Sequence, residues 1–193
     1  MSVSSSSRLV YPSEYAYYDN SITRAESPKA NCRRYPAGDL LGGLHPQDYI
    51  HCDGAQLKLA DSNIGQEQYR SSDYYEWHAG SDGQLLFIFS TRVSLTTITL
   101  HYYSDSVRGL PRLRFFAVPD DFDVWYALTS GNPYASVVSV PPGEEPAGRR
   151  SISVSVGVNF NTKKVLMYKY SSSFPFALSE VEFFTSSSKH WLV

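Results

Sequence analysis

The residues of this chain best suited to bind a ligand are aromatic and basic side chains in two polar segments. The segment GQEQYRSSDYYEW holds three tyrosines and an arginine, and the segment SDSVRGLP holds a second arginine; these residues are Tyr69, Arg70, Tyr74, Tyr75 and Arg108. Stacking faces mixed with hydrogen-bonding groups are what sugars and peptides require of a binding site. We therefore predict a ligand-binding site here, if both segments lie at the same end of the fold. The alternative is that both are ordinary exposed loops.

Motifs of catalysis are absent from the sequence. It has no G-x-S-x-G, no phosphate-binding loop and no dinucleotide fingerprint, and its five histidines lack the spacing of a zinc site. An acidic cluster, Asp120, Asp121 and Asp123, follows Pro119. Aspartates after a proline are ordinary residues of a turn. The sequence thus predicts no catalytic residues and a protein that is not an enzyme.

The elements that must position the binding residues are β-strands. Apolar and polar residues alternate in much of the stretch from Gln84 to Phe184, and clusters of Gly, Pro, Asn and Ser divide it at short intervals. The apolar face switches within Leu95–Leu100, which indicates a bulge or a bend. The pattern predicts an all-β fold: an antiparallel β-sandwich, or jelly roll, of about eight main strands, with Trp77 and Trp125 largely buried.

The chain is predicted to form a single domain. Residues 1–35 are polar, include a run of serines and show no periodic apolar face, so we expect this segment to be poorly ordered. Residues 36–193 form the β-sandwich domain. Within it, separate strands are expected at Gln84–Ser90 and Val93–Tyr103.

Composition bears on compartment and partners. The net charge of -2 gives no basic footprint for nucleic acid, and no apolar run approaches the roughly 20 residues that span a bilayer. The N-terminus lacks the apolar segment of a signal peptide, which leaves a cytoplasmic protein as an alternative to a secreted or cell-surface one. Cys32 and Cys52 lie in the same irregular segment, and we predict a disulfide between them; two free thiols are the alternative.

Three motifs carry a resemblance to a known fold. Leu59-Ala60-Asp61-Ser62 looks like an early Leu-x-Asp-Gly turn with serine in place of glycine, LRFFAVPDDFDVW looks like a hairpin followed by an aromatic ring, and Leu178–Phe183 looks like a closing strand that carries a glutamate. Their order and spacing, over roughly residues 55–185, resemble the galactose-binding-domain-like superfamily. This superfamily includes discoidin (coagulation factor V/VIII type C) domains and related carbohydrate-binding modules. The chain departs from it at Ser62 and in its cysteines, which do not bracket the domain as they do in many discoidin domains.

The resemblance also implies a cofactor, a structural calcium ion. Related carbohydrate-binding modules hold such an ion with an aspartate of the early turn, backbone carbonyls and a glutamate of the last strand. The matching residues here are Asp61, Asn63 and Glu180, and hard cations prefer clustered oxygen ligands of this kind. The alternative is that Asp61 and Asn63 shape an Asx turn and that Glu180 is solvated.

These observations predict a non-catalytic recognition module of a cell-surface or secreted protein, of the kind that serves cell adhesion. It would bind a glycan or a protein ligand through loops at one end of the sandwich. One alternative is an accessory or catalytic domain of a glycan-active hydrolase, which a matched pair of carboxylates in a cleft would favour. Another is an intracellular scaffold domain, which free cysteines would favour. The sequence does not name the ligand.

Overall fold

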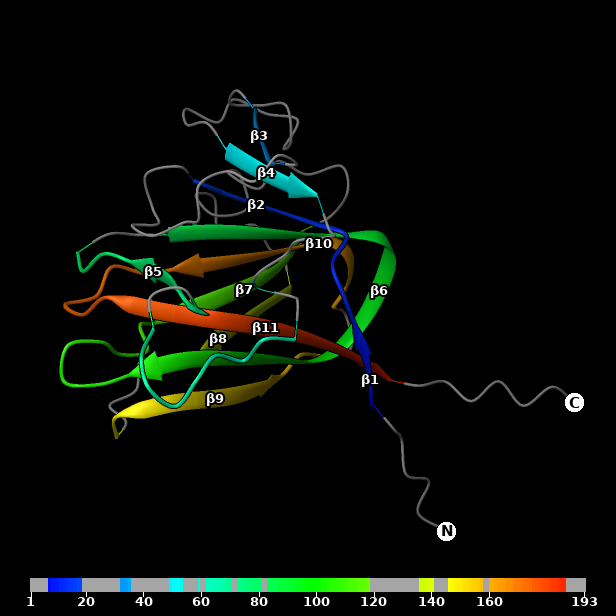
Figure 1. Ribbon diagram of the computed structural model, residues 1–193. Helices are drawn as coiled ribbons and strands as arrows, with labels where there is room; N and C mark the ends of the chain where they lie inside the picture. The colour runs from blue at the N-terminus through cyan, green and yellow to red at the C-terminus, as the bar shows by residue number, and fades with distance from the viewer. Residues whose placement is uncertain are drawn as a thin grey trace, which may run out of the picture.

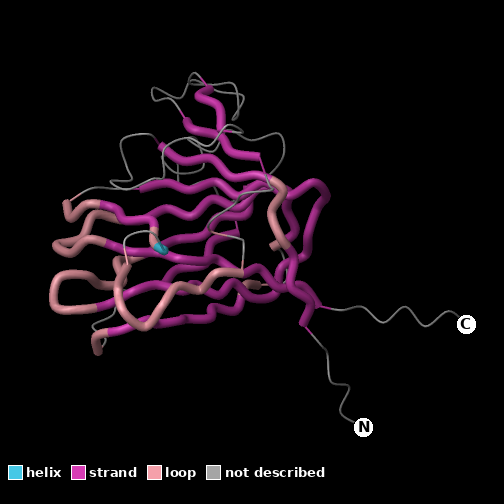
Figure 2. Tube along the Cα trace, viewed as in Figure 1, coloured by secondary structure: helices cyan, strands magenta, loops and turns pink. Residues whose placement is uncertain are grey.

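Antiparallel β-strands make up most of the described structure (Figure 2). The computed structural model describes residues 7–18, 32–35, 49–53, 59, 62–70, 73–80, 83–118, 136–140, 146–157 and 160–186. In this part of the chain, no helix has the length and hydropathy needed to cross a membrane. The strands are β1 (Ser7–Val10), β2 (Glu14–Tyr18), β3 (Cys32–Tyr35), β4 (Tyr49–Asp53), β5 (Tyr75–Trp77), β6 (Gly83–Ser104), β7 (Leu113–Val118), β8 (Ser136–Val140), β9 (Gly148–Ser155), β10 (Asn161–Lys169) and β11 (Phe176–Ser186).

The strands form two sheets, and in Figure 1 β11 of one sheet crosses in front of β7 and β8 of the other. One sheet has the order β3-β4-β2-β6-β10-β7-β8, and in the other β11 pairs with β1, β5 and β6 while β6 also pairs with β9. The pairings between described strands are antiparallel. The predicted antiparallel β-sandwich is therefore confirmed.

Strand β6 belongs to both sheets. Its first half pairs with β2 and β10, and its second half pairs with β9 and β11. Between the halves the strand turns from one sheet into the other (Figure 1). The register of β11 against β6 shifts between Phe184 and Thr185, as a β-bulge does. The bulge or bend predicted within Leu95–Leu100 is confirmed. The prediction of two separate strands is wrong, because the extended backbone continues through the turn.

Aromatic side chains fill the space between the sheets. Phe183 of β11 meets Phe87 of β6 edge to face, with ring centres 4.9 Å apart. Trp77 of β5 stacks on Phe176 of β11 at 5.6 Å. All four rings are fully buried, and such pairs add roughly 0.5–1.5 kcal/mol each beyond the area that they bury. The predicted burial of Trp77 is confirmed, whereas Trp125 lies outside the described residues.

The N-terminal residues take part in the sheets. Strand β1 pairs with β11 from Ser7↔Ser186 to Val10↔Phe183, and β2 lies between β4 and β6. Val10 also packs against the core. These strands differ from the poor order that we predicted for residues 1–35, because the apolar partners of β1 lie at the far end of the chain. The predicted domain boundary at residue 35 stays a prediction.

Candidate functional site

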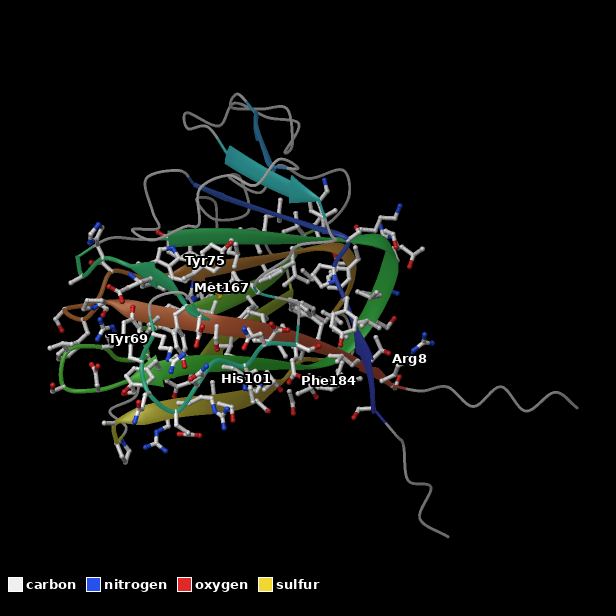
Figure 3. The ribbon with its side chains drawn as sticks, in the orientation of Figure 1. Arg8, Tyr69, Tyr75, His101, Met167 and Phe184 are labelled. Atoms are coloured by element: carbon white, nitrogen blue, oxygen red, sulfur yellow. The ribbon has the colours of Figure 1, made fainter. Side chains whose placement is uncertain are left out.

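Two connections between the sheets meet at one end of the sandwich. Residues 105–112 join β6 to β7, and residues 170–175 join β10 to β11. The amide of Gly109 donates to the carbonyl of Pro175 at 3.2 Å, and that of Tyr170 donates to Arg112 at 3.0 Å. Figure 3 places Tyr69 at this end, on the left, and Arg8 at the opposite end. We call this part of the molecule the loop end.

Arg108 is the central charged residue of the loop end. Its Nε donates to Oε2 of Glu76 at 2.9 Å, and its Nη1 donates to Oδ2 of Asp105 at 2.9 Å. The other carboxylate oxygen of Asp105 accepts the backbone amides of Val107 and Arg108, which fixes the turn that carries the arginine. Burial lowers the pKa of Arg108, but the hydrogen bond and the charge of Glu76 outweigh it, so the pKa is raised. The guanidinium is therefore held in one orientation before any ligand arrives.

The guanidinium of Arg108 packs over the ring of Tyr69. The central carbon of the Arg108 guanidinium lies 3.8 Å from the centre of the Tyr69 ring, which is a cation–π contact. The Tyr69 hydroxyl donates to the same Glu76 oxygen that Arg108 contacts. The ring also stacks on Tyr74 at 5.5 Å and meets Tyr103 at 5.3 Å. Three tyrosines thus form a packed aromatic base under one arginine.

The preceding loop fixes the position of this aromatic base. Gly65 has φ +75°, and a Cβ there would lie 2.5 Å from the Tyr74 hydroxyl, so only glycine fits. That hydroxyl donates to the carbonyl of Gln66 at 2.9 Å. Arg149 of β9 donates to the Gly65 carbonyl at 3.1 Å and pairs with Glu67 at 2.8 Å. Burial, and then the charge of Asp73, raises the pKa of Tyr74 to about 12.

The structure brings together part of the predicted ligand-binding set. Tyr69, Tyr74 and Arg108 lie in one cluster, and Arg70 is exposed next to Tyr69 in the sequence. Tyr74 and Tyr75 are only 0% and 4% exposed, however. A ligand at the surface would not reach the Tyr75 ring, which belongs to the core. Neither ring is therefore open to a ligand at the surface: Tyr74 packs against Tyr69, and Tyr75 packs in the core.

Sequence reasoning missed Glu76, Asp105 and Tyr103. A signal for Asp105 was present, because an aspartate before a tight turn commonly accepts backbone amides two or three residues on. Glu76 follows Tyr75 in β5 and therefore points to the opposite face of the strand. Nothing in the sequence pairs Glu76 with Arg108, since 32 residues separate them.

The residues predicted to hold calcium make other contacts. Oδ1 of Asn63 accepts the amide of Gly65 at 3.1 Å, which is the Asx turn of the alternative interpretation. Glu180 is only 1% exposed, so it is not solvated, and its Oε1 accepts the amide of Ser62 at 3.2 Å. Asp61 lies outside the described residues. Among the residues that are described, no three His, Cys, Asp or Glu side chains gather as a metal site requires. Calcium therefore stays a proposal, with Glu180 as the buried carboxylate beside which it would bind.

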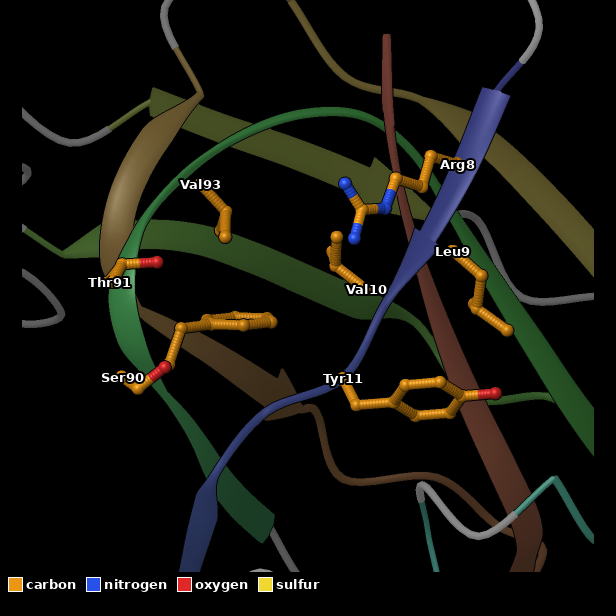
Figure 4. Close-up of a pocket in the computed structure, with 8 residues that line it drawn as sticks. Arg8, Leu9, Val10, Tyr11, Ser90, Thr91 and Val93 are labelled. Carbon is orange, nitrogen blue, oxygen red and sulfur yellow. The ribbon is translucent and has the colours of Figure 1, made fainter. Parts of the chain in front are cut away.

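A pocket of about 330 Å³ lies at the opposite end of the sandwich (Figure 4). One side of the pocket is formed by β1 and Tyr11, and the other side is formed by the segment in which β6 turns from one sheet into the other. Its lining is Arg8, Leu9, Val10, Tyr11, Phe89, Ser90, Thr91 and Val93. None of the predicted ligand-binding residues lines it, and Figure 3 shows Arg8 far from Tyr69. The pocket is therefore separate from the loop end.

No protein-family model and no curated protein matches this chain. The chain is similar to several solved structures. A fucose-binding module of Streptococcus pneumoniae is 17% identical, with a TM-score of 0.46 over 67% of this chain and 83% of that one. The lectin domain of lectinolysin, complexed with Lewis B antigen, is 13% identical, with a TM-score of 0.49 over 81% and 92%.

A family 32 carbohydrate-binding module from C. perfringens NanJ, in complex with galactose, is 9% identical, with a TM-score of 0.43 over 66% and 82%. These proteins are of the kind that the sequence motifs resemble. At such identities and TM-scores the similarity assigns neither a ligand nor a site to this chain.

Proposed function

We propose that this protein is a non-catalytic recognition module that binds a neutral saccharide at the loop end. The observation that carries the proposal is the state of Arg108, which two carboxylates and the Tyr69 ring hold in place. Its Nη2 has no protein partner among the described residues. A donor that is oriented in advance and still unused loses little conformational entropy when it binds a ligand.

The charges around Arg108 favour a neutral ligand. One guanidinium faces two carboxylates, those of Glu76 and Asp105. Their combined charge is negative, so an anionic ligand would be repelled from this point. Saccharide hydroxyls both donate and accept hydrogen bonds, and they match an arrangement in which an arginine donor lies between carboxylate acceptors. The proposal rests on this geometry and not on the similarity to solved structures.

The same contacts support a binding role over a catalytic one. Glycoside hydrolysis requires one carboxyl group that gives a proton and a second that acts as base or nucleophile. Glu76 and Asp105 instead contact the same arginine. We further propose that the module belongs to a secreted or cell-surface protein, because such proteins encounter glycans. An accessory domain of a glycan-active enzyme would use the loop end in the same way.

A shallow site of this kind binds single sugars weakly, with a Kd near 1 mM, or about -4 kcal/mol. Useful strength then comes from several copies that act together. The test is therefore an array of neutral glycans probed with a multimerised domain. We compare the natural protein with Arg108→Lys, which keeps the charge but loses the planar fork of donors. Arg8→Lys, at the opposite end, is the matched control.

We expect Arg108→Lys to weaken the affinity for the glycan at least tenfold, which is about 1.4 kcal/mol. Arg8→Lys should change this affinity less than twofold. Tyr69→Phe removes the hydroxyl that contacts Glu76 and gives a milder variant should Arg108→Lys unfold. Equal binding by folded Arg108→Lys and by the natural protein would show that the saccharide site lies elsewhere. Binding to no neutral glycan by a folded multimer would overturn the proposed function.

A further inference from the structure

Two arginines at the loop end share one tyrosine ring. The guanidinium carbons of Arg112 and Arg114 lie 5.0 and 5.5 Å from the centre of the Tyr170 ring. Tyr168 meets Tyr170 edge to face, with ring centres 4.8 Å apart. Within the described part of the chain, neither guanidinium has an ion pair or a side-chain hydrogen bond. The Nε of Arg114 is buried and has no hydrogen-bond partner.

The register of the strands places these side chains on one face. Tyr168 of β10 is opposite Arg114 of β7, and the bond from the Tyr170 amide to the Arg112 carbonyl continues the pairing by one step. Residues two apart in a strand point to the same side. Lys169 and Leu113, which lie between them, are fully buried. The four side chains therefore lie on the opposite, outer face of the sheet, where Arg112 is exposed.

This cluster differs from the other arginines of the loop end. Arg108 contacts two carboxylates, and Arg149 pairs with Glu67. Arg112 and Arg114 bring two positive charges toward one ring without a described carboxylate to offset them. Like charges at short range repel, and a buried donor without a partner costs roughly 1–3 kcal/mol. An anionic oxygen group that accepts from both guanidiniums would offset their repulsion.

We propose that Arg112, Arg114 and Tyr170 form a subsite for the anionic group of an acidic saccharide. The saccharide class rests on the proposed function of the loop end, whereas the preference for an anion rests on this cluster alone. Arg112 lies in the same connection as Arg108, four residues further along the chain. A chain of several sugars could place neutral units at Arg108 and an acidic unit at the arginine pair. The anionic group is either a sulfate ester or a sugar carboxylate.

The test uses the whole protein and four immobilised probes. Heparin carries sulfates and carboxylates, fully desulfated heparin and hyaluronan carry carboxylates only, and dextran is neutral. The variant is the double substitution Arg112→Gln, Arg114→Gln. The matched control is Arg8→Gln, Arg92→Gln, which removes the same charge at the opposite end of the sandwich, where β1 lies beside the turn of β6.

We expect the variant to bind heparin at least tenfold more weakly than the natural protein and the control to bind within twofold of it. Binding to desulfated heparin and hyaluronan identifies a carboxylate as the ligand group, and its loss identifies a sulfate. Equal loss in variant and control would show diffuse charge attraction and overturn the subsite. An unchanged affinity for every anionic probe, with or without a lower melting temperature of the variant, would also overturn it and leave the cluster a purely structural one.

The two proposals fail separately. If neutral glycans bind through Arg108 and acidic probes bind no more tightly than neutral ones, the proposed function stands and the anionic subsite is contradicted. If heparin binding depends on Arg112 and Arg114 but no neutral glycan binds, the anionic subsite stands and the proposed function is contradicted.

Discussion

The backbone amide of Ser62 donates a hydrogen bond of 3.2 Å to the side chain of Glu180, so a turn early in the chain is tied to a buried carboxylate of the last strand. Ser62 adopts φ 69° to reach it, a left-handed conformation that is costly for any residue with a Cβ. The sequence resemblance places a glycine at this position. The serine keeps the shape of that turn at the cost of local strain.

Replacing Ser62 by glycine should stabilise the protein. Glycine removes the left-handed strain of about 1 kcal/mol, while the exposed hydrogen bond between the Ser62 and Tyr11 hydroxyls contributes less. We expect Ser62→Gly to raise the free energy of unfolding by about 0.5–1 kcal/mol in urea titrations. Ser62→Ala, which loses the hydroxyl but keeps the Cβ, should not gain stability. If the glycine variant is less stable than the natural protein, the backbone of Ser62 is not strained as we infer.

Calcium beside Glu180 is tested by melting metal-stripped protein with and without the ion. If calcium binds only the folded state, added calcium raises the melting temperature by mass action and a chelator reverses the rise. We expect Glu180→Gln to abolish this response and Glu182→Gln, two residues further along the strand and paired with His101, to retain it. A melting temperature that calcium does not move would leave the Asx turn of Asn63 as the role of this segment.

Tyr74 should make stability depend on pH in the alkaline range. Burial and then Asp73 raise its pKa from 10.0 to about 12, so the folded protein holds the phenol proton more tightly than the unfolded chain does. The stabilising contribution is complete below pH 10 and is lost as the pH rises from 10 toward 12. We expect Tyr74→Phe to flatten this part of the profile and, at pH 8, to cost about 1 kcal/mol for the lost hydrogen bond to Gln66.

Denaturant unfolding at a series of pH values measures both effects. Tyr11→Phe, which alters an exposed tyrosine, is the control and should keep the alkaline loss of stability. If Tyr74→Phe loses stability above pH 10 as steeply as Tyr11→Phe does, the pKa of Tyr74 is not the cause.

The backbone supports the predicted disulfide. Cys32 of β3 and Cys52 of β4 are directly opposite in an antiparallel pair. Residues so placed have Cα atoms about 4.5–5.5 Å apart, which is within the range that disulfides span. The side chains of both cysteines lie outside the described residues, so the bond itself stays a prediction.

Protein matured in an oxidising compartment should resist alkylation without reductant, and intact mass would then show no modified thiol. Reduction should lower the free energy of unfolding by up to about 3 kcal/mol. A Cys32→Ser, Cys52→Ser variant serves as the reference for the reduced state. Two alkylated thiols in secreted material would rule out the bond.

The kind of fold and most strands between Gln84 and Phe184 could be predicted from the sequence, whereas β1 and β2 of the polar N-terminal segment could not. Side chains of a strand alternate between two faces, so burial of one face leaves a pattern of period two that can be read locally. In β9, for example, Ile152 and Val154 pack toward the core while the serine between them, Ser153, is exposed. The bulge of β6 near Leu95 could be predicted for the same reason, because the pattern changes face there.

Which side chains meet at the loop end could not be predicted, because residues far apart in the sequence form the contacts there. Arg108 and Glu76 are distant in the sequence, and the course of β6 and β11 brings them into contact. The burial of Tyr74 likewise depends on Gly65 and Tyr103, neither of which its neighbours in the sequence specify. Alternation tells a residue's face but not its partner. The pairing of distant strands supplies the partner, because it fixes the register in which their ends and loops meet.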